Sequence, residues 1–341
     1  MNIGLLGFGV VGRGVYEITN TREDMQVTKV LCLEEISLPD AEAVKDIRSI
    51  VEDPSIDTVV EAMGGLHPAY EFVRAAIENG KNVVTSNKAL VCSFYDELLP
   101  LAVEKGVSFR STAAVGGGIG WLSELERARR VQKLNEVGGI MNGTCNYILD
   151  NMTRFGLDYA DVLKQAQQLG YAEADPSTDV DGIDTWHKVI LSSNIAFGVT
   201  VDKATVPVAG IRNIQAQDVE NFKAHDLVCK LISTGKRTEK GYSIFVQPTL
   251  VKSGDLEAAV PMNYNLITFV GETSDRMSFY APYGEKVAAD GDLELTWYVR
   301  GNWQGDVAEK WGEAVVTKAV SVADMHAWIK ANPDAFVAAI R

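Results

Sequence analysis

Residues 1–15, MNIGLLGFGVVGRGV, decide the fold that we expect for the N-terminal part of the chain. A short apolar run is followed by three glycines at the spacing GxGxxG, and a helical pattern begins directly after them. This order is typical of a dinucleotide-binding site, because the glycines let a pyrophosphate approach the backbone and the helix N-terminus faces it. The alternative is a glycine-rich turn that binds nothing. The residues expected to contact the cofactor here are Gly7, Phe8, Gly9, Val10, Val11 and Gly12.

Strand-like and helical patterns alternate after this turn, which predicts an α/β domain. The strands are expected at residues 27–33, 58–62, 82–85 and 107–111, and the helices at 69–79 and 98–105. Ser86, Asn87 and Lys88 follow one of these strands, and open α/β sheets bind ligands at the carboxyl ends of their strands. We therefore expect these three residues to line the cofactor site. A solvated loop residue is the alternative interpretation of Lys88.

The residues after strand 27–33 bear on the choice between NAD and NADP. Glu34 lies about twenty residues after the glycines, where an acidic side chain bonds the ribose 2′-hydroxyl of NAD. Leu33 offers no charge to a 2′-phosphate, and no arginine or lysine directly follows this strand. Lys45 and Arg48 reach the ribose only if the connecting loop folds over it. The sequence therefore favours NAD, with Glu34 as the ribose ligand.

Residues 170–188, GYAEADPSTDVDGIDTWHK, form the second informative stretch. Its first part has the glycine, proline and aspartate content of a loop, and a helical pattern starts at Ile183. Asp184 and Lys188 stand at i and i+4 on that helix, so the carboxylate can hold the ammonium in place. Glu173 in the loop is a candidate for binding a substrate ammonium. The plain alternative is a solvated ion pair, which contributes roughly a few tenths of a kcal/mol.

The alternation changes beyond residue 125, and strand-like segments become more frequent after Phe197. This pattern predicts a second domain with helices on one side of a mixed sheet. Its strands are expected at residues 136–141, 242–248, 266–271, 277–280 and 293–299, and its helices at 146–155 and 162–169. Val322, Met325, Trp328 and Ile329 recur at helical spacing, so residues 319–341 are expected to form an amphipathic helix that packs back on the nucleotide domain.

Composition excludes several classes of partner. The chain has 341 residues, 46% of them hydrophobic, which is enough for two domains. Its 32 basic and 46 acidic residues give a net charge of −14, which argues against nucleic acid and anionic membranes as partners. Its 4 cysteines have no CxxC spacing, so we expect reduced thiols in a cytoplasmic protein. No apolar run reaches the roughly 18 residues of a membrane-spanning helix.

Taken in order, the motifs GFGVVGRGV, VVEAMGG, VVTSNKALV, NGTCNYIL and GYAEADPSTDVDGIDTWHK resemble those of homoserine dehydrogenases. The resemblance implies reduction of L-aspartate 4-semialdehyde to L-homoserine with NADH or NADPH. It implies an N-terminal Rossmann domain, residues 1–125, and an α+β catalytic and dimerisation domain with a mixed sheet, residues 126–318. A homodimer that binds a small amino-acid substrate is expected.

The resemblance also implies roles for individual residues. Lys188 is expected to be the proton donor, Lys88 to lie near the nicotinamide, and Glu173 and Asp184 to hold the substrate. The NGTCNYIL motif adds three residues to the substrate-binding set, namely Asn142, Gly143 and Thr144. The backbone carbonyls expected to bind a monovalent cation, Na⁺ or K⁺, are those of Thr112, Val115, Gly117 and Ile119.

Two other functions are compatible with the same sequence. One is a dehydrogenase of the same scaffold that acts on a related amino-acid alcohol or aldehyde, because the C-terminal third departs from the family pattern and lacks its Pro-Thr-Ala helix start. The other is a non-catalytic nucleotide-binding regulatory protein. The second is less favoured, because Lys88, Glu173, Asp184 and Lys188 are all present, whereas a decayed site loses some of its chemical groups.

Overall fold

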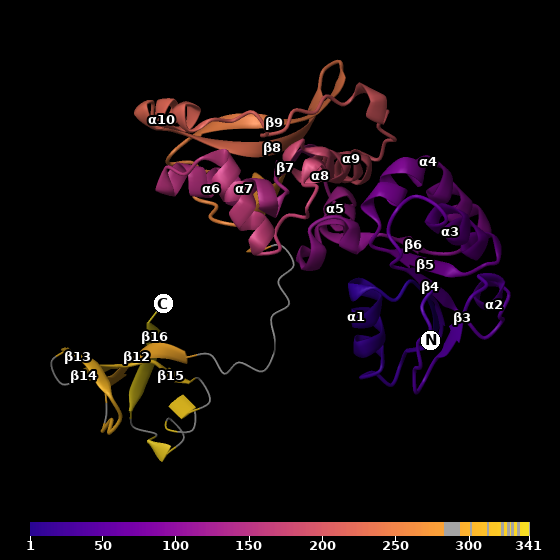
Figure 1. The fold of residues 1–341 in the computed structure, drawn as a ribbon, viewed down its shortest axis with the longest axis horizontal. Coiled ribbons are helices and arrows are strands. Elements are labelled where there is room, and N and C mark those ends of the chain that lie inside the picture. Colours follow the sequence, from indigo (N-terminus) through magenta and orange to yellow (C-terminus); the bar gives the residue numbers. More distant parts are fainter. Residues whose placement is uncertain are drawn as a thin grey trace. The chain divides into compact units, whose positions relative to one another are not determined.

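The computed structural model describes residues 1–282, 294–300, 302–311, 314–321, 324–325, 328, 331–332 and 335–340 (Figure 1). The chain forms two compact units, Met1–Gly284 and Glu285–Arg341, which we describe separately. In the described part of the chain, no helix combines the length and the apolar character needed to cross a membrane. All candidate site residues lie in the first unit.

The first unit begins with a parallel sheet of six strands in the order β3-β2-β1-β4-β5-β6 (Figure 1). The strands are β1 (Asn2–Leu6), β2 (Gln26–Leu31), β3 (Glu42–Val44), β4 (Thr58–Glu61), β5 (Asn82–Thr85) and β6 (Phe109–Arg110). The helices between them are α1 (Val10–Thr19), α2 (Arg48–Val51), α3 (Ala69–Glu78) and α4 (Lys88–Lys105). Leu5, Val30, Val59 and Val83 are fully buried, as expected for parallel strands with both faces covered.

The predicted N-terminal strands are confirmed, but β3, α2 and the early start of α4 were not expected. β3 was not expected, because its three residues, EAV, carry too little periodicity to be recognised. Helix α4 begins at Lys88, ten positions earlier than the predicted residue 98, because the side chain of Asn87 caps it by accepting a hydrogen bond from the backbone N–H of Leu90.

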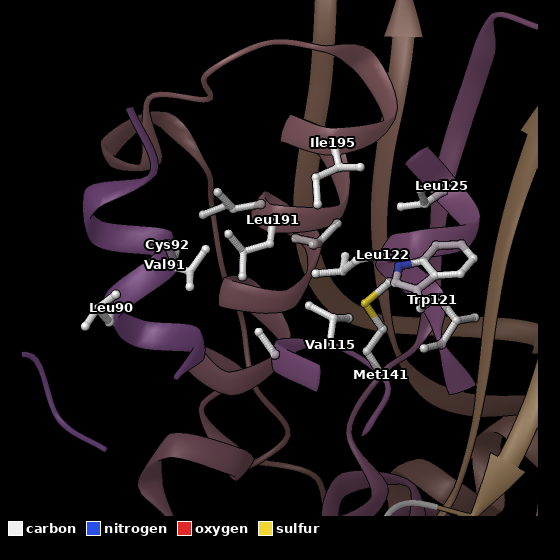
Figure 2. Packing of buried hydrophobic residues seen from close by; sticks show 14 of the residues in the cluster. Leu90, Val91, Cys92, Val115, Trp121, Leu122, Leu125, Met141, Leu191 and Ile195 are labelled. Carbon is white, nitrogen blue, oxygen red and sulfur yellow. The ribbon is translucent and has the colours of Figure 1, made fainter. Parts of the chain in front are cut away.

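A short connection joins the parallel sheet to the rest of the unit. It contains two 3₁₀ turns, η1 (Thr112–Ala114) and η2 (Gly117–Ile119), and then helix α5 (Trp121–Arg129). Figure 2 shows the shared core at this junction, where Val91 of α4 and Leu122 of α5 lie on either side of Leu191 of a later helix, α9 (Ile183–Phe197). The helix that carries Asp184 and Lys188 therefore packs directly on the helix that carries Lys88.

The second sheet of this unit has five strands in the order β11-β10-β7-β8-β9. They are β7 (Leu134–Ile140), β8 (Leu227–Thr238), β9 (Gly241–Lys252), β10 (Tyr264–Gly271) and β11 (Arg276–Pro282). The accompanying helices are α6 (Gly143–Phe155), α7 (Tyr159–Gln168), α8 (Ser177–Val180), α9, η3 (Lys203–Thr205) and α10 (Ala216–Ala224). The predicted fold class, a Rossmann-like domain followed by an α+β domain, is confirmed.

The strand pairing in this sheet differs from our expectation of a mixed sheet. Every pairing between neighbouring strands is antiparallel, and parallel pairing is limited, among the described residues, to one bridge between Val208 and Val246. Gly138 and Gly139 occupy the central strand, β7, where a Cβ atom would overlap the carbonyl oxygens of Ser233 and Leu266 on the two neighbouring strands. The sheet therefore needs glycine at both positions.

The second unit corrects the expected C-terminal helix. Its strands are β12 (Glu294–Arg300), β13 (Val307–Trp311), β14 (Ala314–Thr317), β15 (Val320–Ser321) and β16 (Phe336–Ile340). A continuous helix over 319–341 is therefore wrong at its two ends, where β15 and β16 pair with β12, whereas the described residues 324, 325, 328 and 331 between these strands are helical. Met325 is buried with Val299, and Trp328 packs against them. Val322 and Ile329 lie outside the described residues.

Candidate active site

A cavity of about 420 Å³ lies at the carboxyl edge of the parallel sheet. Residues from distant parts of the first unit line it: the first turn of α1, the loops after β4 and β5, and helices α8 and α9. Val10, Ser86, Lys88, Asp184 and His187 are among these residues. The structure thus brings the glycine turn, the Ser-Asn-Lys segment and the acidic stretch to one place.

The glycine turn has the shape that a bound pyrophosphate requires. Gly7 has a φ of 92°, and a Cβ atom there would lie 2.8 Å from the carbonyl oxygen of Ala62. A Cβ at Gly12 would overlap the carbonyl oxygen of Gly7, so helix and strand meet there without a side chain between them. Gly9 faces open space, and no side chain caps the N-terminus of α1. These residues fit a dinucleotide, whose pyrophosphate binds at such a helix N-terminus.

The end of strand β2, where the cofactor's ribose is expected, holds a lysine that the sequence did not place there. Nζ of Lys45 donates to the carbonyl oxygens of Cys32, Leu33 and Glu34 at 3.0, 2.8 and 2.7 Å. Lys45 reaches them because β3 runs parallel to β2 with Val44 opposite Leu31. The loop between the strands therefore folds over, and an ammonium stands beside the exposed Glu34.

Helix α9 holds the central charged group of the site. Nζ of Lys188 lies 2.6 Å from Oδ2 of Asp184, one turn earlier, and also donates to the carbonyl oxygen of Met141 at 2.6 Å. The Lys188 side chain is only 2% exposed. Nζ of Lys88, at the start of α4, lies 3.1 Å from Oδ1 of Asp184. The pair is therefore buried and shared with a second lysine, so the solvated-pair alternative does not describe it.

The charges of this group determine its protonation. Burial alone raises the pKa of Asp184, but the ammonium groups of Lys188 and Lys88 outweigh burial, so the pKa lies well below its usual value. Asn142 Nδ2 adds a hydrogen bond to Oδ2 of Asp184 at 3.0 Å. Asp184 is consequently an anion at neutral pH, and it joins Lys88, which lines the cavity as Asp184 does, to the buried Lys188.

Asn142 links this carboxylate to a second one. Its side-chain NH₂ group also donates to Oδ1 of Asp179 on α8 at 2.7 Å. Its side-chain oxygen caps α6 by accepting from the backbone N–H of Cys145 at 2.8 Å. Burial raises the pKa of Asp179, and the hydrogen bond from Asn142 acts against this. Gly143 is the first residue of α6, and Thr144 follows it with its hydroxyl donating to the carbonyl oxygen of Tyr171 at 2.5 Å.

Other predicted residues lie outside this buried group. Glu173 is exposed on the loop after α7, where its backbone carbonyl accepts from Nε2 of Gln167 at 3.0 Å. The residues proposed for a monovalent cation, Thr112, Val115, Gly117 and Ile119, occupy η1, η2 and the segment between them. In the described parts of the chain, no cluster of three or more His, Cys, Asp or Glu side chains offers a metal site.

Sequence reasoning missed six residues at the cavity, and two of them, Thr178 and His187, have polar side chains. Burial lowers the pKa of His187, and the nearby Lys88 and Lys203 act in the same direction while Asp184 opposes them. The imidazole is therefore neutral at pH 7. Its position was available in the sequence, because His187 lies three residues after Asp184 and so shares its face of the helix.

Comparisons with known proteins cover both parts of the site. Residues 7–111 match the family described as "Homoserine dehydrogenase, NAD binding domain", and residues 121–291 match "Homoserine dehydrogenase". The homoserine dehydrogenase of Synechocystis sp. (strain ATCC 27184 / PCC 6803 / Kazusa) is 37% identical over 296 residues, which are 82% of this chain and 68% of that one. The enzyme of Bacillus subtilis (strain 168) is 34% identical over 83% of this chain and 68% of its own.

Solved structures agree. The homoserine dehydrogenase of Thiobacillus denitrificans aligns with a TM-score of 0.78 and 27% identity, over 100% of this chain and 97% of that one. A hyperthermophilic archaeal homoserine dehydrogenase in complex with NADPH shares the fold, with a TM-score of 0.71 and 22% identity over 83% of this chain and 92% of its own. Because the NAD-binding segment and the catalytic segment match the same family, the chain belongs to the homoserine dehydrogenases, which are NAD(P)-dependent oxidoreductases.

Proposed function

We propose that the site interconverts L-homoserine and L-aspartate 4-semialdehyde, with Lys188 as the proton donor. The observation that carries this proposal is the buried carboxylate of Asp184 held between Lys188 and Lys88 at the cavity edge. The nicotinamide cofactor, when bound, supplies or accepts the hydride. Negative charge develops on the aldehyde oxygen during reduction, and an ammonium stabilises that charge and provides a proton.

Each neighbouring group has a part in this chemistry. Asp184 holds the ammonium of Lys188 at 2.6 Å, and the carbonyl oxygen of Met141 fixes its direction. Asp184 and Glu173 are the carboxylates available to bind the amino group of the substrate. Gly143 and Thr144 open α6, whose first backbone N–H groups favour an anion such as the substrate carboxylate. Glu173, on its exposed loop, is the group that contacts substrate arriving from solvent.

Of the two cofactors, NAD fits the ribose end of the site better. An ammonium has three hydrogens to donate, and Lys45 donates to three backbone carbonyl oxygens, so none remains for a 2′-phosphate. The adjacent Glu34 is exposed and repels a phosphate, whereas it accepts a hydrogen bond from a free ribose hydroxyl. Leu33, with 99% of its surface exposed, adds no charge.

Two further features complete the proposed enzyme. The carbonyl groups of Thr112, Val115, Gly117 and Ile119 bind Na⁺ or K⁺, which is tested by comparing rates in potassium, sodium and choline salts. Two chains form a homodimer, which is supported by the exposed Met277 and Tyr280 on the edge strand β11 and is tested by light scattering. Large exposed apolar side chains on a strand edge favour association.

The decisive experiment follows cofactor reduction spectrophotometrically with L-homoserine and a panel of related amino alcohols. The proposal predicts the highest kcat/KM for L-homoserine. A higher kcat/KM for another amino alcohol would assign the same chemistry to that substrate. Cofactor binding without turnover of any alcohol would leave a nucleotide-binding protein.

A further inference from the structure

Glu61, the last residue of β4, is a buried acidic residue for which the proposed mechanism has no use. Only 1% of its surface is exposed. Its Oε1 accepts hydrogen bonds from the backbone N–H groups of Met63 at 2.8 Å and Gly64 at 3.3 Å. Its Oε2 accepts from the hydroxyl of Thr85 at 2.5 Å, directly opposite on β5. Hydrogen bonds alone, without a lysine or arginine, stabilise this carboxylate within the described part of the chain.

Thr85 connects Glu61 to the start of helix α4 through hydrogen bonds. A hydroxyl has one hydrogen, and Thr85 gives it to Glu61, so its oxygen is left to accept from the backbone N–H of Asn87, at 3.0 Å. Asn87 in turn donates to the carbonyl oxygen of Gly65 at 2.6 Å and caps α4 through Leu90 at 3.1 Å. Lys88 is the next residue, the first of that helix.

The network ends on two walls of the cavity. One is the loop after β4, where Met63 and Gly64 line the cavity, and the other is the start of α4, where Asn87 and Lys88 line it. Glu61 contacts the first wall directly and the second through Thr85. Burying a carboxylate is unfavourable unless every oxygen finds donors, so the arrangement has one preferred geometry.

We propose that Glu61 is a positioning residue that sets the spacing of these two walls, and thereby the binding of the dinucleotide and the aim of Lys88. This inference rests on the proposed function for the role of Lys88, but its effect on dinucleotide binding does not. A merely structural carboxylate would stabilise the turn without affecting either property.

The direction of the hydrogen bonds makes the inference testable by a substitution that conserves shape. In Glu61→Gln, one carboxylate oxygen becomes an NH₂ group that donates. If it faces Thr85, the hydroxyl hydrogen must turn away and compete with the N–H of Asn87. If it faces the loop, it opposes the N–H groups of Met63 and Gly64. Either orientation breaks one branch of the network.

The experiment compares Glu61→Gln, Thr85→Val and Thr85→Ser with a matched control, Thr58→Val. Thr58 lies at the opposite end of β4, is 5% exposed, and donates to the sulfur of Met1, outside the network. NADH affinity is measured by fluorescence titration, kcat and KM with L-homoserine, and Tm by calorimetry. We expect Glu61→Gln and Thr85→Val each to weaken NADH binding and to lower kcat by about tenfold or more, as misplaced groups do. Thr85→Ser keeps the hydroxyl and should therefore retain the NADH affinity and the kcat of the wild type.

The control should lose thermal stability while keeping NADH affinity and kcat. If Glu61→Gln and Thr85→Val behave like the control, the positioning role is overturned. If Glu61→Gln does not fold, Thr85→Val and its rescue by serine carry the test. If the wild-type protein does not turn over L-homoserine, the proposed function fails, yet the NADH titrations still decide whether Glu61 shapes the dinucleotide site.

Discussion

Nζ of Lys88 lies 3.1 Å from Oδ1 of Asp184, although one residue opens α4 at the edge of the parallel sheet and the other lies in α9. The second oxygen of the same carboxylate belongs to Lys188. One carboxylate therefore contacts two ammonium groups, with the carboxylate of Asp179 close by. An ammonium stabilises the negative charge that develops on a substrate oxygen. Substituting the two lysines one at a time distinguishes their roles.

Lys188→Ala should lower kcat by roughly 10²–10⁴-fold, because it removes a positioned proton donor. Affinity for the dinucleotide, measured by fluorescence titration, should remain. The exposed Lys164 on α7 provides the control. Lys164→Ala removes an ammonium from a helix that contributes no residue to the cavity lining, so it should leave kcat unchanged. A near-normal kcat for Lys188→Ala would transfer the role to Lys88.

Glu173→Gln should raise KM for L-homoserine about ten- to a hundredfold, because a charge-assisted hydrogen bond contributes about 1.5–3 kcal/mol. If that bond is equally strong in the ground and transition states, kcat changes much less. Steady-state kinetics decide between the possibilities. A collapse of kcat at constant KM would place Glu173 in the chemical step, and unchanged constants would leave it a surface residue.

The wild-type protein should bind NAD more tightly than NADP in calorimetric titrations. Lys45→Met should weaken the binding of NADP more than that of NAD, because only NADP carries a phosphate beside the lost charge. Tighter wild-type binding of NADP would mean that the ammonium of Lys45 leaves the carbonyl oxygens of residues 32–34 when the cofactor enters.

The free energy of unfolding should increase with pH above about 8 because of the buried Lys230. Its fully buried ammonium donates to Asn146 and to the carbonyl oxygen of Val260, with Asp150 at 3.8 Å. Burial lowers its pKa to about 8, with Asp150 opposing. An unfolded lysine titrates near pH 10.4, so between these values the unfolded chain binds more protons and the free energy of unfolding increases with pH.

Measured by urea unfolding, the wild type should gain on the order of 3 kcal/mol relative to Lys230→Met from pH 8 to 10.4. Below pH 8 the difference between the two should stay constant. Lys240→Met, at an exposed position, should show no such slope. A flat difference for Lys230→Met would mean that Lys230 titrates like a lysine in water.

Thiol reagents should modify Cys32 first in the native protein. Cys32 is half-buried, whereas Cys92, Cys145 and Cys229 are buried. Burial raises the pKa of Cys92 to about 12 and that of Cys229 to about 11, and it raises that of Cys145 well above its usual value. The thiolate is the reactive form. Mass spectrometry after brief alkylation checks this, and early modification of Cys145 would contradict the burial of α6.

Local patterns predicted much of this fold. The glycine spacing after residues 3–6 and the i, i+4 spacing of Asp184 and Lys188 were sufficient to place a nucleotide turn and an ion pair. They also placed Asp184 on a helix. The carboxyl-edge rule predicted the side of the sheet on which Lys88 lies, but no periodicity encodes its contact with Asp184, which depends on the packing of α4 against α9.

The remaining differences have separate physical causes. β3 is too short to show a period, and without it the position of Lys45 could not be derived. At the C-terminus, the helical spacing of Met325 and Trp328 corresponds to helical residues, but the helix does not extend to residues 336–340, which pair with β12 instead. Glu61 ends a buried strand in the run TVVEA, and only the register with Thr85 reveals why an acidic residue is tolerated there.

Asn142 is followed by Gly143, and in an unstructured chain an asparagine–glycine step is the one that loses its side-chain amide most readily. Here Gly143 is fixed in the first turn of α6, and both branches of the Asn142 amide are bound. Loss of the amide would leave a third carboxylate beside Asp179 and Asp184, with no hydrogen to offer either. Chemical ageing of the enzyme is therefore coupled to its unfolding: each molecule that opens, even briefly, risks a lesion that refolding does not repair.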